Sequence, residues 1–257
     1  NLREHEEKKF KIKLVEKIKK ISFNNVIFKY NLSDKEILND INFEVNTNDF
    51  LGIIGTSGSG KSTILHLLSG LIKPTKGKII LNQYSQNNIC EFNLDNKISY
   101  IPQDSFILDT TLDSNIAFAD HNYEIDQHKI QECLNFTNLQ EFVENLPKKS
   151  KSLLGDGGSK ISHGQRQRIG LARAIYNDPD VIILDESLNA LDYKNEKQIL
   201  SNIKDLKDKI LIFVSHRLES LKLCNKLLIL DEGLVKDFGN KEEVLSRNKD
   251  LKTVDIF

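Results

Sequence analysis

A glycine-rich segment that ends in a lysine and two hydroxyl residues carries the strongest chemical signal in this chain. In order, its residues are Gly55, Thr56, Ser57, Gly58, Ser59, Gly60, Lys61, Ser62 and Thr63. The segment follows an apolar run at 50–54 and precedes another at 64–68, so we expect it between a strand and a helix. Glycines let backbone N–H groups turn around phosphate oxygens, and a helix N-terminus attracts the anion. We therefore expect a nucleoside triphosphate here, with Lys61 on its β- and γ-phosphates and Ser62 as a Mg²⁺ ligand.

Two adjacent carboxylates, Asp185 and Glu186, follow the continuous apolar run 181–184. Ligands of open parallel sheets bind at the carboxyl ends of the strands, so this pair is expected beside the glycine-rich segment. There Asp185 would hold Mg²⁺ and Glu186 would align the water that attacks the γ-phosphate. A solvated strand end, or the N-cap of a helix, is the alternative interpretation of these two acids.

Two further polar residues follow runs typical of strands. Gln103 comes shortly after the run 98–101, and His216 comes two residues after the run 210–214. At the same edge of the sheet, Gln103 could contact Mg²⁺ and the attacking water, while His216 could donate a hydrogen bond to the γ-phosphate. A surface glutamine and a structural histidine are the simpler interpretations of each residue taken alone.

The apolar patterns predict the strands that must position these residues. Residues 21–28 and 37–45 alternate, which is typical of antiparallel strands at the edge of a sheet. Residues 181–184 and 210–214 are continuously apolar, which indicates parallel strands covered on both faces. We predict an α/β fold, a P-loop NTPase core with a parallel sheet, an antiparallel β edge subdomain and an inserted helical subdomain. Further strands are expected at 50–54, 78–81, 98–101 and 227–230.

Domain organisation follows from changes in this pattern. Between the strands at 98–101 and 181–184 the apolar residues have helical periodicity, which predicts a helical subdomain at about residues 104–175. The first residues are dense in charge, so residues 1–20 are predicted to form a charged linker and residues 21–257 one domain.

Composition excludes several classes of function. The 36 basic and 37 acidic residues give a net charge of −1, which is not the electrostatic footprint of a nucleic-acid-binding protein. The cysteines, Cys90, Cys133 and Cys224, form no C-x-x-C pair, which argues against a zinc ribbon or a disulfide framework. No apolar run approaches the length of about 18 residues that spans a membrane. The sequence contains no methionine, so we expect it to be part of a longer protein.

Residues 161–168 read Ile-Ser-His-Gly-Gln-Arg-Gln-Arg and run into a predicted helix. This segment resembles the signature motif of ABC-type ATPases. The resemblance covers nearly the whole chain, because seven motifs of that family have counterparts here in the family's order. They are an adenine-stacking aromatic at Tyr30, the phosphate loop 55–63, Gln103, the signature at 162–165, Asp185 with Glu186, a D-loop at 190–192 and the switch histidine His216.

The resemblance implies that residues 21–257 form an ABC ATPase domain with ATP and Mg²⁺ as cofactors. It also implies a head-to-tail dimer, in which Ser162, Gly164 and Gln165 bind the ATP held by the phosphate loop of a second nucleotide-binding domain. His163 stands where the family usually has glycine, and its side chain would weaken or retune the contact with phosphate.

Two segments indicate the branch of the family. Residues 153–158 and 111–116 both resemble exporter sequences. The resemblance thus implies an ATP-hydrolysing domain at the cytoplasmic face of the cell membrane, which powers a transmembrane domain on the same chain or on a separate subunit. The sequence does not indicate the transported substrate.

Two other functions stay open at this stage. A soluble ABC-type ATPase of chromosome maintenance or translation is one. Lys61 and Ser162 lie only 101 positions apart with no coiled coil between them, which argues against the chromosome type. The translation type resembles two fused units, whereas this chain has one. A regulatory ATP sensor without turnover is the other; the presence of Glu186 and His216 argues against it, while His163 leaves it open.

Overall fold

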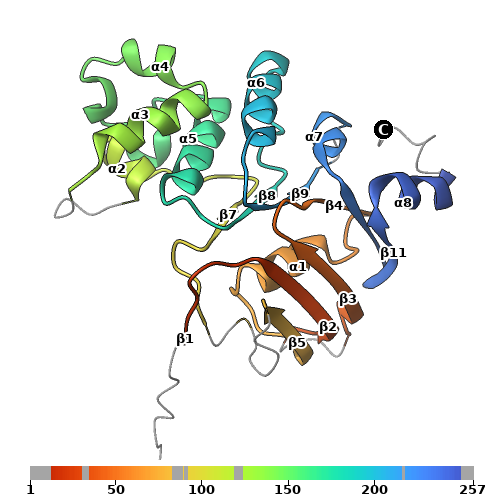
Figure 1. The fold of residues 1–257 in the computed structure, drawn as a ribbon. Helices are drawn as coiled ribbons and strands as arrows, with labels where there is room; N and C mark the ends of the chain where they lie inside the picture. The colour runs from red at the N-terminus through yellow and green to blue at the C-terminus, as the bar shows by residue number, and fades with distance from the viewer. Residues whose placement is uncertain are drawn as a thin grey trace, which may run out of the picture.

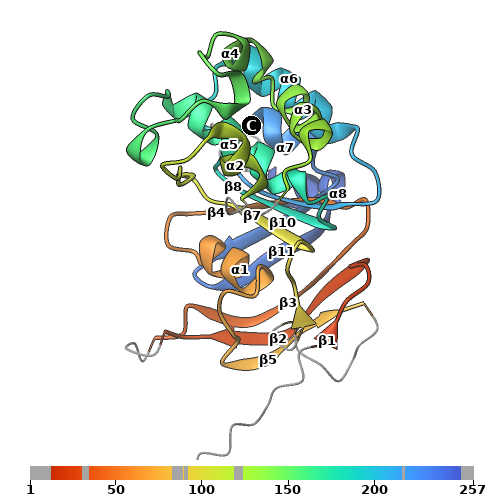
Figure 2. The same cartoon turned by 90° about the vertical axis from the view of Figure 1, so that its left-hand side faces the viewer.

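Three sheets and a group of helices build the described part of the chain (Figures 1 and 2). The computed structural model describes residues 13–30, 35–82, 89, 92–118, 124–215 and 218–249. The strands are β1 (Lys13–Leu14), β2 (Lys20–Phe28), β3 (Leu38–Asn46), β4 (Phe50–Gly55), β5 (Lys76–Leu81), β6 (Phe92–Asn93), β7 (Ile98–Ile101), β8 (Val181–Asp185), β9 (Ile210–Val214), β10 (Lys226–Asp231) and β11 (Leu234–Asn240). The helices are α1 (Lys61–Leu68), α2 (Leu112–Ala117), α3 (Gln127–Phe136), α4 (Gln140–Glu144), the 3₁₀ turns η2 (Lys149–Lys151) and η3 (Asp156–Gly158), α5 (His163–Tyr176), α6 (Tyr193–Lys204), α7 (Leu218–Leu223) and α8 (Lys241–Arg247).

A six-stranded sheet forms the centre, in the order β11-β10-β4-β9-β8-β7. Its strands are parallel except β11, which pairs antiparallel with β10. Alternate residues of β8 enter different cores: Ile183 packs on the side of α1, whereas Ile182 packs on the side of α5 and α6. Side chains of a strand alternate between the two faces of a sheet, so a strand covered on both faces must be apolar throughout.

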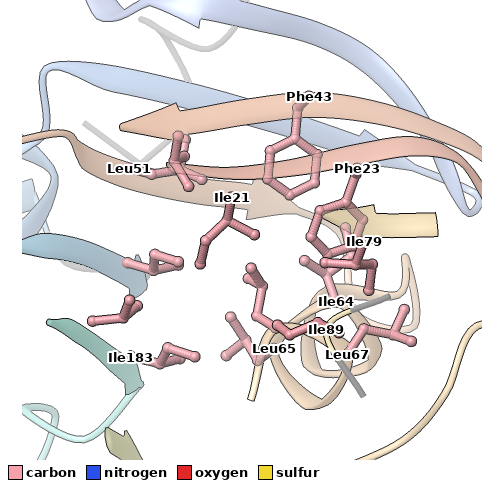
Figure 3. Close-up of a cluster of buried hydrophobic side chains, with 14 of the residues drawn as sticks. Ile21, Phe23, Phe43, Leu51, Ile64, Leu65, Leu67, Ile79, Ile89 and Ile183 are labelled. Atoms are coloured by element: carbon pink, nitrogen blue, oxygen red, sulfur yellow. The ribbon is translucent and has the colours of Figure 1, made fainter. Parts of the chain in front are cut away.

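The largest core lies between the central sheet and the three-stranded antiparallel sheet β3-β2-β5, with α1 in the middle. Figure 3 shows Ile64, Leu65 and Leu67 of α1 in this cluster, with the stacked rings of Phe23 and Phe43 from the antiparallel sheet. This helix is apolar on nearly all sides because sheets pack around it, and the turn at residues 69–70 ends it.

Helices α2, α3, α4 and α5 lie between β7 and β8 in the sequence and gather at one end of the molecule, away from β2, β3 and β5 (Figure 1). They share a core of their own, to which Leu112, Ile130 and Ile169 contribute. Helix α5 belongs to two cores, because Ile169 packs among these helices while Leu171 packs on the central sheet. It therefore connects the helical group to the sheet.

The charged start of the chain differs from the solvated linker that we expected. Within the described residues 13–20, Val15 is 5% and Ile18 0% exposed, and both join the large core. The Asp180 carboxylate just before β8 accepts a hydrogen bond from the Ile18 N–H at 2.9 Å. Val15 and Ile18 thus pack into the large core, while Glu16, Lys17 and Lys19 between and after them stay exposed.

In the described part of the chain, no helix combines the length and the apolar character that crossing a membrane requires.

Candidate nucleotide site

The ends of neighbouring parallel strands bring the predicted site residues together. Strand β4 ends at Gly55 and β8 ends at Asp185, with β9 between them in the sheet. Val214 of β9 is in register with Ile53 on one side and with Asp185 on the other. The phosphate loop and the two carboxylates therefore emerge at the same edge of the sheet, as the sequence predicted.

Two positions of the phosphate loop require glycine, Gly55 because of steric crowding and Gly60 because of its backbone conformation. A Cβ atom on Gly55 would lie 2.4 Å from the Leu230 carbonyl oxygen and 2.6 Å from Ser59 Oγ. Gly60 is the N-cap of α1 with φ of +103°, a conformation that glycine adopts without strain. Gly60 has no side chain with which to cap the N–H groups of the first turn of α1. They are thus available to an anion, and the helix dipole favours one there.

Lys61 lies over the start of this loop and is 9% exposed. Its ammonium donates to the Gly55 and Thr56 carbonyl oxygens at 2.7 and 2.8 Å. Burial lowers the pKa of Lys61, and the negative charges of Glu186 and Asp185 oppose this shift. The ammonium is therefore within electrostatic range of both carboxylates. Because an ammonium has three N–H groups, the two loop carbonyls leave one for a phosphate oxygen.

The Asp185 carboxylate has a partner that sequence reasoning missed. The Tyr100 hydroxyl of β7 donates to Asp185 Oδ2 at 2.9 Å, and the Tyr100 ring contacts His66 of α1 edge to face. Burial raises the pKa of Tyr100, and the hydrogen bond to Asp185 raises it further. Tyr100 thus stays a hydrogen-bond donor and fixes the orientation of the carboxylate. Its proximity depends on β7 and β8 being neighbours, which no local pattern reveals.

Glu186 has an unusual backbone conformation. Its φ is +50°, the left-handed region, which costs a residue with a side chain roughly 1–2 kcal/mol. The Glu186 N–H donates to the Val214 carbonyl at 2.9 Å, and Asn189 Nδ2 donates to Glu186 Oε2 at 3.1 Å. Strain of this kind is concentrated at functional sites. The structure therefore holds the Glu186 side chain in a specific direction at the edge that carries the phosphate loop.

The remaining loop residues differ in exposure. Thr56, Ser57, Gly58 and Ser62 are exposed, whereas Ser59 and Thr63 are buried. Ser62 lies at the start of α1 and is exposed, so a metal ion can reach its hydroxyl.

Two further predicted residues are also exposed, Gln103 beyond the end of β7 and Tyr30 beyond the end of β2. The Tyr30 ring is 46% exposed, and the ring of Phe28 supports it in an edge-to-face contact with centroids 4.9 Å apart. A supported, exposed aromatic ring can stack on a flat base. His216, the other predicted residue, lies outside the described residues.

The signature segment, residues 162–165, opens α5. Ser162 is the N-cap: its Oγ accepts from the Gln165 N–H at 3.2 Å, and Gln165 Oε1 accepts from the Ser162 N–H at 2.8 Å. His163, which replaces the usual glycine, lies with its Nε2 3.0 Å from Asp104 Oδ1. The imidazole thus pairs with the residue that follows Gln103, a contact that the sequence did not indicate.

The phosphate loop and the signature segment open helices on opposite faces of the sheet. Ile64 and Leu65 of α1 share a core with Ile183, whereas Leu171 of α5 shares a core with Ile182. Asp185 and Glu186 are close to the phosphate loop, whereas the signature segment opens a helix on the other face of the sheet.

Comparison with known proteins gives consistent matches. Residues 38–189 match the ABC transporter family. The chain is 35% identical over 236 residues to a putative export ATP-binding/permease protein of Rickettsia bellii, covering 91% of this chain and 40% of that protein. It is 34% identical to an ATP-dependent lipid A-core flippase of Cupriavidus pinatubonensis, covering 88% and 39%. It is 35% identical to a lactococcin-G-processing and transport ATP-binding protein of Lactococcus lactis subsp. lactis, covering 88% and 32%.

Among solved structures, a bacterial Atm1-family ABC exporter with ATP bound matches with a TM-score of 0.83 and 29% identity. The match covers 92% of this chain and 41% of the exporter chain. The predicted fold class is thereby confirmed. The chain spans about two fifths of the length of the Rickettsia bellii and Cupriavidus pinatubonensis relatives and of the exporter chain.

Proposed function

The chain belongs to the ABC transporter family and is an ATP-binding domain of the exporter type, and from this premise we propose that it hydrolyses Mg·ATP to drive transport across a membrane. The observation that carries the proposal is the group of Lys61, Asp185 and Glu186 beside the uncapped N-terminus of α1. It combines a cation, a metal-binding carboxylate and a carboxylate that can act on water, which are the parts that phosphoryl transfer requires.

The phosphate loop and Lys61 would bind the triphosphate. The backbone N–H groups around Gly60 would donate to its oxygens, and the remaining N–H of Lys61 would bind the γ-phosphate. The exposed ring of Tyr30 would stack on the adenine. Lys61 already contacts the phosphate loop at the edge of the central sheet, whereas Tyr30 would reach the base from the end of β2 in the antiparallel sheet.

The residues near the loop suit Mg²⁺. Ser62, Gln103 and Asp185 offer a hydroxyl, an amide and a carboxylate oxygen, the ligand types that this hard cation prefers. Bound there with the phosphates, Mg²⁺ would neutralise charge that develops during transfer. The hydrogen bond from Tyr100 leaves Asp185 Oδ1 for this role.

Glu186 is the proposed residue for the attacking water. Its carboxylate, directed by the strained backbone and by Asn189, would accept a hydrogen bond from the water and polarise it. His216 would donate to the γ-phosphate, and this role rests on its position in the sequence after β9.

A second nucleotide-binding domain would complete each site. Ser162, Gly164 and Gln165 lie at the N-terminus of α5, where the helix dipole favours an anion. We propose that they bind the ATP on the phosphate loop of a partner in a head-to-tail dimer, either a second copy or a related subunit.

A transmembrane domain is the proposed mechanical partner, on the same chain or on a separate subunit, with this domain at the cytoplasmic face. Two relatives are named for different cargo, lipid A-core and lactococcin G, although their identity to this chain is almost the same. We propose that the choice of cargo resides outside the ATP-binding domain.

The substitution Glu186→Gln tests the proposed hydrolysis. It keeps the shape of the side chain and removes the basic oxygen, so phosphate release should fall by roughly 100-fold or more. ATP binding, measured by titration calorimetry, should stay within about 2-fold of the wild type. The matched control is Glu132→Gln on the exposed face of α3. Wild-type turnover in the Glu186 variant would contradict the assigned role.

A further inference from the structure

One stripe of helix α5 packs against the edge of the sheet that carries the proposed site. Gly164, Gln167 and Gly170 recur at three-residue spacing, which places them on neighbouring parts of one helix surface. A Cβ atom on Gly164 would lie 3.2 Å from the Ala190 carbonyl oxygen, and one on Gly170 would lie 2.0 Å from Ser105 Oγ. Helix α5 is therefore wedged between the segment after β7 and the loop after β8.

Gln167 lies at the centre of this stripe and is 2% exposed. Its Nε2 donates to the Gln103 carbonyl oxygen at 3.2 Å, and its Oε1 accepts from the Ala190 N–H at 3.0 Å. One buried amide thus connects both segments to the signature helix. Removal of the Gln167 amide would leave the Gln103 carbonyl and the Ala190 N–H without this partner. Because a buried polar group is costly to leave unpaired, both segments would be released together.

The loop that Gln167 contacts is continuous with Glu186. Asn189 N donates to the Glu186 carbonyl at 3.1 Å, and Asn189 Nδ2 donates to the Glu186 carboxylate, so a shift of Ala190 would move the support of that carboxylate. On the other side, His163 of α5 pairs with Asp104, adjacent to Gln103. The contacts of α5 therefore reach both Gln103, which the proposed function places at Mg²⁺, and Glu186, which it places at the attacking water.

We propose that Gln167 is a positioning residue that holds Gln103 and the Glu186 loop in fixed relation to the signature helix. The inference rests on the proposed function, because it assigns Gln103 and Glu186 to the same reaction. It follows that a displacement of α5, such as a partner's nucleotide would cause at its N-terminus, reaches both residues through one side chain. Gln167 itself touches neither ATP nor water in this scheme.

Two variants separate the two hydrogen bonds. Gln167→Met has a similar volume and removes both bonds. Gln167→Glu keeps an acceptor for the Ala190 N–H and loses the donor to the Gln103 carbonyl. The control is Gln198→Met on the exposed face of α6, where the amide bonds only to Asn202 within the same helix among the described contacts.

Hydrogen exchange of the 257-residue chain tests the connection itself. The Ala190 amide should exchange at least about 10-fold faster in Gln167→Met than in the wild type, and at nearly the wild-type rate in Gln167→Glu. The control should leave it unchanged. Wild-type protection of Ala190 in Gln167→Met would overturn the proposal, whatever the activity of the chain.

Kinetics test the consequence for the reaction. We expect kcat to fall about 10- to 100-fold in Gln167→Met, with the ATP dissociation constant within about 2-fold, because misplacement affects the transition state more than binding. A merely structural role would lower the melting temperature and the fraction of active protein and leave kcat per folded molecule unchanged. If Gln167→Met fails to fold, the kcat of Gln167→Glu tests the positioning role instead. We expect a smaller loss of kcat in that variant than in Gln167→Met, because it keeps the bond from the Ala190 N–H.

The two proposals fail in different ways. A wild-type chain that binds ATP but shows no turnover in the presence of a competent partner would sink the proposed function, and hydrogen exchange would still decide on Gln167. A wild type that hydrolyses ATP, with both Gln167 variants at wild-type kcat, would sink only the positioning role.

Discussion

Each carboxylate at the candidate site is oriented by a neutral donor, Asp185 by the Tyr100 hydroxyl and Glu186 by the Asn189 amide. A neutral donor directs a carboxylate without cancelling its charge, whereas a nearby lysine or arginine would neutralise it. Lys61, the cation in range of both, donates instead to the Gly55 and Thr56 carbonyls. The negative charge therefore stays available to a metal ion and to water.

At this scale we predict that Tyr100→Phe weakens the use of Mg²⁺. The ring keeps its contact with His66, but Asp185 loses the bond that orients it, and removal of such a partner typically costs a metal site about 10-fold in affinity. The Mg²⁺ concentration for half-maximal ATP turnover should rise accordingly, while nucleotide affinity without Mg²⁺ stays unchanged. Tyr193→Phe, at a tyrosine that is 68% exposed, is the control. An unchanged Mg²⁺ requirement in Tyr100→Phe would show that the hydroxyl does not support the metal site.

At the scale of elements, local patterns were sufficient for most of the fold. The apolar runs at 181–184 and 210–214 correspond to β8 and β9 because strands buried on both faces leave no polar positions. The phosphate loop and Asp185 with Glu186 were predictable because each is a run of consecutive residues. The roles of Tyr100 and Gln167 were not predictable, because their partners meet them only through tertiary packing. Asp185 is 85 positions from Tyr100, and Gln103 and Ala190 are 64 and 23 positions from Gln167. The charges around Val15 and Ile18 concealed their burial.

The contact between β11 and α8 gives a prediction for pH. Arg247 donates to both carboxylate oxygens of Asp237 at 3.0 and 2.8 Å, and Asn248 donates to Oδ2 at 2.7 Å. The hydrogen bonds from Arg247 hold the pKa of Asp237 below its ordinary value of 3.8, and the bond from Asn248 lowers it further. A carboxyl group whose pKa is lower in the folded state stabilises the fold above its unfolded pKa, and this contribution disappears as the pH falls through the folded value.

Asp237→Asn should therefore lower the melting temperature at pH 7, by an amount of the order of a few degrees. The difference from the wild type should shrink as the pH falls below 3.8, the ordinary value for this group. Thermal unfolding followed by circular dichroism over a series of pH values measures it. Glu243→Gln is the control, because that carboxylate lies 3.9 Å from Arg247 and is largely exposed. A difference that is independent of pH would exclude ionisation of Asp237 as its cause.

At the scale of the whole molecule, the two helix ends that we propose to bind phosphate, at Gly60 of α1 and at Ser162 of α5, belong to helices on opposite faces of one sheet. A single ATP on the phosphate loop cannot use both ends of the same copy when they face different surfaces. A head-to-tail pair brings the α5 end of one copy to the α1 end of the other, and a two-fold axis then makes two equivalent sites. This arrangement predicts that the two ends act in trans.

A mixing experiment tests that prediction. Lys61→Ala removes the cation of the phosphate loop, and Ser162→Asp keeps a good N-cap for α5 while placing a negative charge where a partner's phosphate would bind. Each variant alone should lose ATPase activity. When the two are mixed in equal amounts, half of the dimers are mixed and each has one intact site, so about a quarter of the wild-type activity should return. If the α5 end served its own copy's nucleotide, the mixed dimer would contain no intact site and the mixture would stay inactive. A chain that works only with a different partner subunit would also leave the mixture inactive. Size-exclusion chromatography of Glu186→Gln with ATP distinguishes a chain that pairs with itself from one that needs another subunit, because only self-association doubles the mass.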